Sequence, residues 1–309
     1  MNRTAAVACV TGAGTAPELM AEAVLALDAV GRLHGLEIDD THVSFGGIAL
    51  AKAGQAVPAA TRSAILGADA VLVAGADEPA LAEVMSELDL RAELTAVRFG
   101  HEGALAFVTP LEESAEEWAI EVAFQIAESR AMRLAVVGDA PWNELVDAVA
   151  DRHEHVRVEH LAPRVAIPLA AFEPGRFDVV AVAPAWAEPM VEIAAAPSAT
   201  RVAARGLLSE HGPSLFVPLP DGGFATDGHG VVNPSSMLLA VATMLERGLD
   251  APAPAATLAR AVSAALVDGR QTPDLLRYGV GATSREFTSR VVAGFQVSLT
   301  NAEFWVGAA

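Results

Sequence analysis

The stretch "SFGGIALAKAGQAVPAATRSAILGADAVLVAGAD" (residues 44–77) decides the fold class of this chain. It contains a Gly-Gly pair, an "AGQAVP" turn, a segment of helix length and an apolar strand that ends in a glycine loop. Helices that alternate with buried strands in this way are typical of layered α/β proteins, in which helices cover a mainly parallel sheet. The stretch therefore predicts an α/β architecture.

The same alternation extends along the chain in both directions. Short apolar runs rich in β-formers predict buried strands, and the amphipathic stretches between them predict helices. The expected strands are Ala5–Val10, Ala70–Ala74, Leu134–Val137 and Asp178–Val182. The expected helices are Pro17–Leu33, Pro58–Leu66, Ala115–Met132, Asn143–Arg152, Pro234–Gly248, Ala255–Val267 and Ser284–Phe295, with "LDAPAPAAT" (249–257) as a linker between two of them.

Composition narrows the class of partner. The chain has 309 residues, of which 52% are hydrophobic, so it can form one large or two medium domains with sizeable cores. A net charge of −19 argues against a nucleic acid or an anionic membrane as partner but leaves room for small anions. Cys9 is the only cysteine, which excludes an intramolecular disulfide and favours a cytoplasmic location.

Lysine and tyrosine, two of the residue types that transfer protons near neutral pH, each occur once, as Lys52 and Tyr278. The other basic residues are arginines, which stay protonated and act as fixed cations and hydrogen-bond donors. Any mechanism that needs a lysine or a tyrosine must therefore use these two positions.

The turn "VTGAGTAPELM" (10–20) joins the first expected strand to the first expected helix through Gly12 and Gly14. Glycines let the backbone approach a ligand closely, and the N-terminus of the following helix favours an anion. The turn lacks the full dinucleotide fingerprint, so it is also consistent with a tight strand-to-helix connection.

The stretch "RHEHVRVEH" (152–160) is dense in histidine. His153 and His155 are two residues apart, so their side chains would diverge on a helix and align on a strand. We interpret the stretch as a solvated helix end that leads into a strand, and not as a metal site.

Six segments together resemble one enzyme family, the β-decarboxylating dehydrogenases, which include isopropylmalate, isocitrate and tartrate dehydrogenases. The isopropylmalate dehydrogenases are the most similar members. Besides residues 44–77, the resemblance covers "TGAGTAPELMAEAVLALDAV" (11–30), "LDLRAELTAVR" (88–98), "FDVVAVAPAWAEPMVEIAA" (177–195), "LFVPLPDGGFATDGHGVVNPSSMLLAVATML" (215–245) and "TPDLLRYGVGATSREFTSRVV" (272–292).

The resemblance implies an open α/β sheet in two discontinuous domains with the active-site cleft between them. The larger domain would comprise residues 1–98 and 198–309, and the smaller domain, with the dimer interface, residues 99–197. It also implies NAD, Mg²⁺ or Mn²⁺, a small 2-hydroxy carboxylic acid, and a homodimer, or a heteromer with a homologous subunit, that shares its active sites.

At the family's substrate and proton-transfer positions, the resemblance implies a mixture of retained and altered residues. Arg91 and Arg98 match substrate-binding arginines. The stretch "ALAFVTPLEESAEEW" (104–118) matches the region of a third arginine and the catalytic tyrosine but contains neither. In "VVGDAPWNE" (136–144), Asp139 or a neighbour stands where the family has its lysine.

The implied metal site is altered as well. Glu188 and Glu192 match two metal-binding aspartates that lie four residues apart on a helix. The extra methylene of each glutamate displaces its oxygens, which a small octahedral ion tolerates poorly. Arg164, in "HLAPRVAIPLA" (160–170), stands where the family has a third aspartate that the partner subunit donates.

The implied cofactor loop departs from the family at Pro220–Gly223, where the family has a histidine-glycine pair. A carboxylate at Asp221 would repel a pyrophosphate. The remaining, vestigial cofactor-binding set is Gly12, Gly14, Asp227, His229 and Asn233.

Three hypotheses about function follow. The first is non-redox chemistry on a small carboxylic acid in the inherited cleft, and the second is a non-catalytic or regulatory dimer subunit. The third is an active NAD-dependent decarboxylating dehydrogenase with relocated acid-base residues. For the first, Arg91 and Arg98 would bind the substrate, and the candidate catalytic residues are His101, Glu102, Asp139, Arg164 and Glu188.

Overall fold

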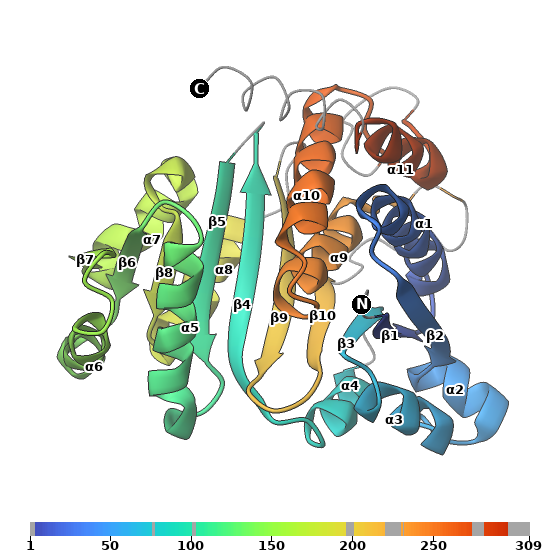
Figure 1. Ribbon diagram of the computed structural model, residues 1–309, viewed down its shortest axis with the longest axis horizontal. Coiled ribbons are helices and arrows are strands. Elements are labelled where there is room, and N and C mark those ends of the chain that lie inside the picture. Colours follow the sequence, from blue (N-terminus) through green and yellow to red (C-terminus); the bar gives the residue numbers. More distant parts are fainter. Residues whose placement is uncertain are drawn as a thin grey trace.

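The computed structural model describes residues 4–75, 78–100, 103–195, 201–219, 230, 232–273 and 281–295 of the chain. Its strands form one mixed ten-stranded sheet in the order β2-β1-β3-β10-β9-β4-β5-β8-β6-β7 (Figure 1). The strands are β1 (Ala5–Thr11), β2 (Ile38–Ser44), β3 (Ala70–Ala74), β4 (Leu90–Phe99), β5 (Gly103–Pro110), β6 (Arg133–Val137), β7 (Arg157–Leu161), β8 (Val179–Val182), β9 (Arg201–Ser209) and β10 (Ser214–Leu219).

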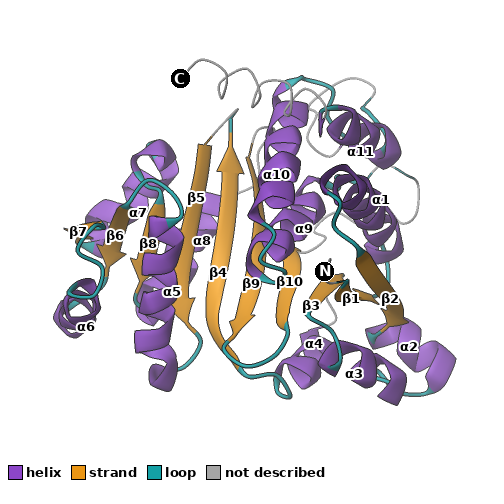
Figure 2. Cartoon of the chain, viewed as in Figure 1, coloured by secondary structure: helices purple, strands orange, loops and turns teal. Residues whose placement is uncertain are grey.

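Helices cover both faces of this sheet (Figure 2). They are α1 (Ala16–His34), α2 (Gly46–Ala53), α3 (Ala59–Leu66), α4 (Glu78–Met85), α5 (Glu116–Glu128), α6 (Ala140–Ala150), α7 (Pro163–Phe172), α8 (Pro184–Ala195), α9 (Ser235–Arg247), α10 (Pro252–Val267) and α11 (Ser284–Ala293), with short 3-10 helices η1 (Glu113–Ala115) and η2 (Pro174–Arg176). None of the helices in the described ranges is both long and apolar enough to cross a bilayer.

The strands fall into two sets of opposite direction. Strands β2, β1, β3 and β10 are parallel neighbours, and β4 runs the same way because β9 is antiparallel to both β10 and β4. Strand β5 is antiparallel to β4 and parallel to β8, β6 and β7. The α/β open sheet that the sequence predicts is confirmed, and it continues without interruption across the predicted domain boundary at the β4–β5 pair. The division into two domains stays a prediction.

One apolar cluster covers the whole length of one sheet face. It packs beneath α1, α5, α6, α9, α10 and α11, and Phe124, Phe216 and Phe287 are among its fully buried members. Figure 1 shows α5 and α10 in front of the sheet on this side, with α8 behind the sheet.

The opposite face carries two separate apolar clusters. The first, called here the α8 cluster, joins Ala166 and Ala170 of α7 and Met190 and Ala194 of α8 to strand residues that include Val97, Phe107 and Ala203. The second, called the α4 cluster, joins Ile65 of α3 and Ala80 and Val84 of α4 to strand residues that include Leu207, Leu215 and Val217. Strands β4, β9 and β10 pass from one cluster to the other, so the middle of this face lies between two helical layers.

Packing explains why a glycine, Gly75, follows strand β3 in the stretch 44–77. Gly75 has a φ of +89°, and a Cβ atom there would lie 2.7 Å from the Cβ atom of Ala16 at the start of α1. A side chain at Gly75 would therefore strain the backbone and push α1 away from the end of β3.

The four strands expected from sequence are confirmed to within one residue at each end, and each expected helix has a counterpart. One expectation was wrong. Residues 252–257 belong to α10 and not to a linker, because Pro252 occupies the first turn of the helix, where its missing N–H has no intrahelical partner to lose.

Candidate functional site

The two arginines predicted to bind substrate lie at opposite ends of β4, seven residues or roughly 23 Å apart. The guanidinium of Arg91 lies 3.6 Å from carboxylates of both Glu112 and Glu210, and it donates a hydrogen bond to the Ser114 carbonyl. Arg98 donates from Nε to the hydroxyl of Ser263 in α10 at 2.8 Å. The structure therefore does not bring these arginines together in one clamp, and substrate binding by either stays a prediction.

Three of the predicted catalytic residues share one edge of the sheet. Asp139, Arg164 and Glu188 follow the carboxyl ends of β6, β7 and β8, which are parallel neighbours. All three side chains are exposed, and among the described residues none of them makes a hydrogen bond or an ion pair. Asp139 leads into α6 on the face of the continuous cluster, whereas α7 and α8 lie on the other face. The set is gathered at one edge without forming a connected site.

The predicted metal ligands Glu188 and Glu192 lie on the exposed side of α8, about opposite Met190 and Ala194, which pack onto the sheet. No third carboxylate, imidazole or thiol of the described ranges joins them in a possible metal site. Metal binding by these two glutamates therefore stays a prediction, because the resemblance implies a further ligand position on the partner subunit.

Two other groups of possible ligands occur elsewhere. In the first, Cys9 with Asp40 and His42, burial and the Asp40 charge raise the pKa of the Cys9 thiol to about 12, so no thiolate forms near neutral pH. In the second, Asp89 with Glu210 and His211, the guanidinium of Arg91 lies between Asp89 and Glu210 and would repel a cation. Neither group is a convincing metal centre.

Of the predicted cofactor residues that the structure describes, Gly12 and Asn233 have local contacts, whereas Gly14 has a φ of +65° with open space around it. A Cβ atom on Gly12 would lie 3.1 Å from the Phe45 ring, so packing accounts for this glycine. Asn233 accepts a hydrogen bond from the Ser235 backbone N–H and so caps the start of α9. His101, Glu102, Asp227, His229 and the lone Tyr278 lie outside the described residues, so these parts of the prediction stay untested.

Glu18, which the sequence reasoning missed, connects the first turn to the second half of the chain. Its carboxylate accepts hydrogen bonds from the backbone N–H groups of Gly230 and Val232, both at 3.2 Å, and from the hydroxyl of Ser284. The start of α1 therefore fixes the backbone that precedes α9 and the beginning of α11. The only sequence signal was an acidic residue in the first turn of a helix, which the helix dipole alone explains.

A second set of residues that the sequence reasoning missed forms a polar row across three strands. It consists of Thr109 of β5, Glu93 and Thr95 of β4, and Arg205 of β9. Glu93 pairs directly with Thr109, and Thr95 pairs directly with Arg205. Because side chains alternate along a strand, all four lie on the face that carries the two separate clusters.

The polar row lies in the interval between the α8 and α4 clusters. On β9, Arg205 stands between Ala203 of the α8 cluster and Leu207 of the α4 cluster. On β4, Val97 belongs to the α8 cluster, and the next two residues on the same face are Thr95 and Glu93. The row therefore occupies the strip of sheet that neither helical layer covers with apolar side chains.

Ionic and hydrogen-bond contacts link most of the row. The Nε atom of Arg205 lies 3.2 Å from Oε1 of Glu93, and the hydroxyl of Thr95 donates to the same oxygen at 3.2 Å. The side chain of Arg205 is 38% exposed and that of Glu93 is 20% exposed, so a solute can reach both. The Thr109 hydroxyl is shielded and has no partner among the described groups, which costs about 1–3 kcal/mol unless a ligand or water satisfies it.

The sequence matches the model of the isocitrate/isopropylmalate dehydrogenase family over residues 6–99 and 100–291. The chain belongs to this family. Among curated members, it is similar to the 3-isopropylmalate dehydrogenase of Bacillus cereus, with 26% identity over 93% of this chain and 95% of that protein. It is 28% identical to the 3-isopropylmalate dehydrogenase of a Synechococcus strain over 87% of this chain and 92% of that protein.

Solved structures of the family share the fold. The apo form of a β-decarboxylating dehydrogenase from Thermococcus kodakarensis has a TM-score of 0.82 at 21% identity, covering 98% of this chain and 99% of that one. An isocitrate dehydrogenase from Methylococcus capsulatus has a TM-score of 0.80 at 19% identity, covering 95% and 100% of the two chains. The alignment with the Bacillus cereus protein extends over 349 positions, so this 309-residue family member lacks segments that its relative has.

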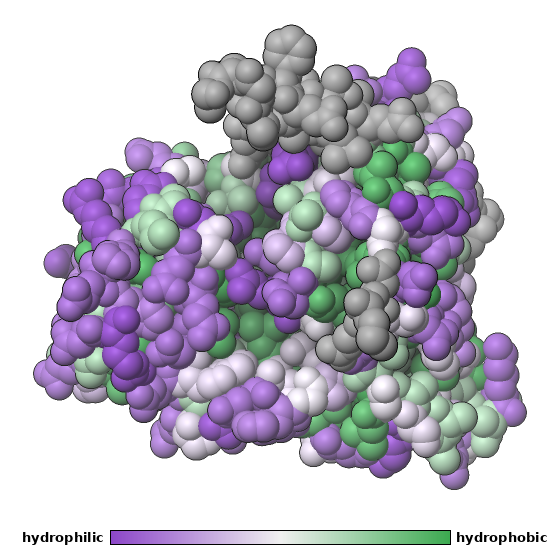
Figure 3. All heavy atoms as spheres, in the orientation of Figure 1, coloured by the Kyte–Doolittle hydropathy of each residue, from purple (hydrophilic) through white to green (hydrophobic). Residues whose placement is uncertain are grey.

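Most side chains of the histidine-rich stretch 152–160 are exposed, as expected for a solvated helix end that leads into a strand, but His153 is an exception. The side chain of His153 is 9% exposed and stacks on Phe124 with ring centroids 4.7 Å apart. Its Nδ1 and Nε2 atoms lie 2.7 and 2.8 Å from carboxylates of Glu128 and Glu121. The imidazole thus fixes the end of α6 against α5. The surface over these two helices is mostly hydrophilic (Figure 3).

The ionisation of His153 predicts a pH dependence of stability. Burial by itself lowers the pKa of His153, but hydrogen bonds and charge from Glu128 and Glu121 outweigh it and raise the pKa above 6.5. A raised folded-state pKa gives stability that is present in full below pH 6.5 and is lost as the pH rises through the folded-state value. We expect the free energy of unfolding of wild type relative to His153→Asn to fall across this window. Urea unfolding at a series of pH values measures the difference, and a constant difference would contradict the assignment.

Proposed function

We propose that this member of the isocitrate/isopropylmalate dehydrogenase family binds a small carboxylic acid at the polar row and acts on it by non-redox proton transfer. The supporting observation is the pair formed by Arg205 and Glu93, a fixed cation beside a carboxylate that can exchange protons. This proposal moves the anion site from Arg91 and Arg98 to the middle of the sheet.

Each residue of the row has a distinct part in the proposed chemistry. Arg205 binds the substrate carboxylate through its guanidinium, which can donate two parallel hydrogen bonds. The Thr109 hydroxyl is shielded from solvent, so it lines the row and is assigned no contact with the substrate. Thr95 holds Glu93 in place. In a substrate whose second and third carbons after the carboxylate are joined by a double bond, the Glu93 carboxylate removes a proton from the carbon beside the carboxylate and returns it at the far end of the double bond. The double bond moves next to the carboxylate, so the product is an isomer and no electron acceptor is needed.

The oxidative chemistry of the family needs groups that the described residues do not supply. By the family resemblance, Asp139 or a neighbour stands at the lysine position, and the exposed glutamates of α8 have no third ligand among the described groups. Gly12 and Asn233 are occupied by local packing and capping. We therefore derive no step through a metal or NAD.

If the substrate binds at the polar row, substitution of Arg205 should weaken the binding of a small carboxylic acid. We expect millimolar 3-isopropylmalate to raise the Tm of wild type by a few degrees, because a ligand that binds only the folded state stabilises it. Arg205→Gln should weaken this binding about tenfold or more, since a charge-assisted contact is lost, and Arg91→Gln should leave it unchanged. Thermal shift titrations of the three proteins measure both effects.

The converse pattern would overturn the proposed site. Loss of the shift in Arg91→Gln with retention in Arg205→Gln would return the anion site to the end of β4. A Tm increase with NAD and Mg²⁺, together with NADH formation from 3-isopropylmalate, would replace non-redox chemistry with the dehydrogenase reaction.

We propose further that the exposed apolar face of α7 and α8 binds a second copy of this chain. Four of the large apolar side chains that the described surface exposes gather there: Val165, Phe172, Trp186 and Ile193. Phe172 is 86% exposed, which is unfavourable for a solvated monomer. The two helices pack side by side, so a twofold axis beside them would bury the same side chains of both copies.

The molecular mass of the protein in solution tests the proposed dimer. Sedimentation velocity should give twice the chain mass for wild type, and Phe172→Glu with Ile193→Glu should give a monomer because two charges cannot be buried unpaired. Leu66→Glu, at an apolar position on α3 that is 50% exposed, should leave the mass unchanged. A monomeric wild type, or a double variant that stays dimeric, would contradict the proposal.

A further inference from the structure

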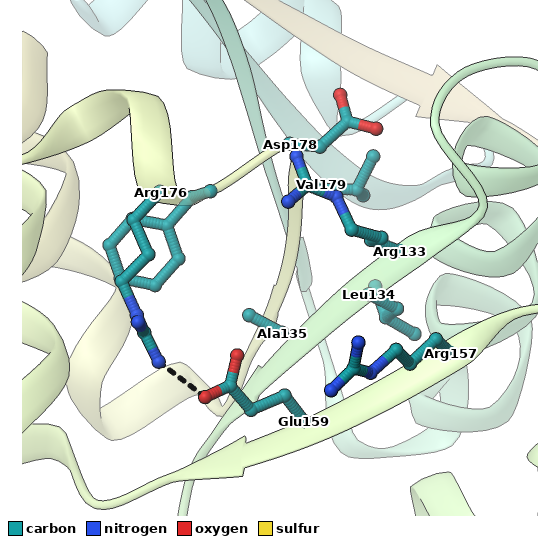
Figure 4. Close-up of a pocket in the computed structure, with 9 residues that line it drawn as sticks. Arg133, Leu134, Ala135, Arg157, Glu159, Arg176, Asp178 and Val179 are labelled. Carbon is teal, nitrogen blue, oxygen red and sulfur yellow. Dashed lines mark hydrogen bonds and ion pairs between the residues drawn. The ribbon is translucent and has the colours of Figure 1, made fainter.

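A small cavity opens at the amino ends of β6, β7 and β8, at the opposite edge from Asp139, Arg164 and Glu188. It has a volume of about 290 Å³. Its apolar side chains on the face of the α8 cluster are Ala135 and Phe177, which are buried. Charged side chains also line the cavity, and Figure 4 shows Arg133, Arg157 and Arg176 around it.

Three of the five charges that line the cavity are compensated. The Arg176 guanidinium pairs with the Glu159 carboxylate across the cavity (Figure 4). The Asp178 carboxylate lies 3.4 Å from Arg130 and accepts a hydrogen bond from the Ala131 backbone N–H at 3.0 Å. These contacts neutralise both carboxylates of the lining.

Two positive charges remain uncompensated. Arg133 and Arg157 are the first residues of β6 and β7 and are direct partners in the parallel register. Within the part of the chain that the structure describes, neither guanidinium has a carboxylate partner. Like charges side by side on neighbouring strands destabilise a sheet. A pair of free arginines in a chain of net charge −19 is therefore a feature that folding alone does not favour.

We propose that this cavity is a binding site for a small dianion, either a phosphomonoester or a dicarboxylate. Arg133 and Arg157 supply two charges that match a dianion, and guanidinium groups bind phosphate and carboxylate oxygens in bidentate fashion. The apolar side chains accommodate the few carbon atoms that the cavity volume allows. The site is separate from the polar row, because the two share no residue. The cavity lies at β6, β7 and β8, and the polar row lies on β4, β5 and β9.

The test uses inorganic phosphate and succinate as probes at constant ionic strength and slightly alkaline pH, where both are dianions. We expect a saturable Tm increase of wild type with at least one of them, and its identity distinguishes the two ligand sources. The double variant Arg133→Gln/Arg157→Gln should bind at least about tenfold more weakly, since each lost guanidinium removes a charge-assisted contact. Arg32→Gln removes the same type of exposed arginine from α1 and should bind like wild type.

Two further measurements separate loss of binding from loss of folding, and this site from the polar row. Without ligand, Arg157→Gln should be as stable as wild type or more so, because it relieves the repulsion with Arg133, and this shows that the variant folds. Arg205→Gln should retain the phosphate or succinate response, which separates this site from the polar row. The proposal is overturned if neither probe gives a saturable shift at millimolar concentration, or if the double variant titrates like wild type.

Discussion

The pairing of β4 with β9 and β5 is the constraint on which the rest of the structure depends. These three antiparallel strands join the two oppositely directed halves of the sheet, and their register sets Thr95 beside Arg205 and Glu93 beside Thr109. Side chains alternate with a period of two, so a slip of one residue would turn Glu93 into the continuous apolar cluster. The same register keeps Ala92 and Leu94 in that cluster. One pairing thus fixes the core on one face and the polar row on the other.

The division of the second face explains why a charged row is tolerated in the middle of a ten-stranded sheet. A buried guanidinium or carboxylate is costly unless it is paired and hydrogen-bonded. Here α7 and α8 cover one end of the face and α3 and α4 the other, and Arg205 and Glu93 remain partly exposed between them. Access to solvent and mutual pairing keep the row stable without a ligand. The partly exposed Arg205 guanidinium is the place where a ligand carboxylate has most to contribute.

Much of the fold, and less of the site, could be predicted from the sequence. Buried strands such as Ala70–Ala74 could be predicted, because a short apolar run between glycine turns is consistent with few other secondary structures. Arg205 was not, because a lone arginine in "VAARGLL" resembles any surface arginine until the register places it beside Thr95 and Glu93. Arg91 and Arg98 illustrate the reverse: the segment match was informative about the family, yet contacts with Glu210 and Ser263 separate the two side chains. His153 was expected in solvent because its stacking partner Phe124 is distant in sequence.

The central claim is that the polar row is where this family member binds a small carboxylic acid. A crystal structure of the protein soaked with 3-isopropylmalate tests this most directly, since it locates the anion without reference to any reaction. The account predicts a carboxylate within hydrogen-bond distance of the Arg205 guanidinium, on the face of the sheet that carries Glu93 and Thr95. An acid bound instead at Arg91 or at Arg98, with the polar row filled by water alone, would contradict it.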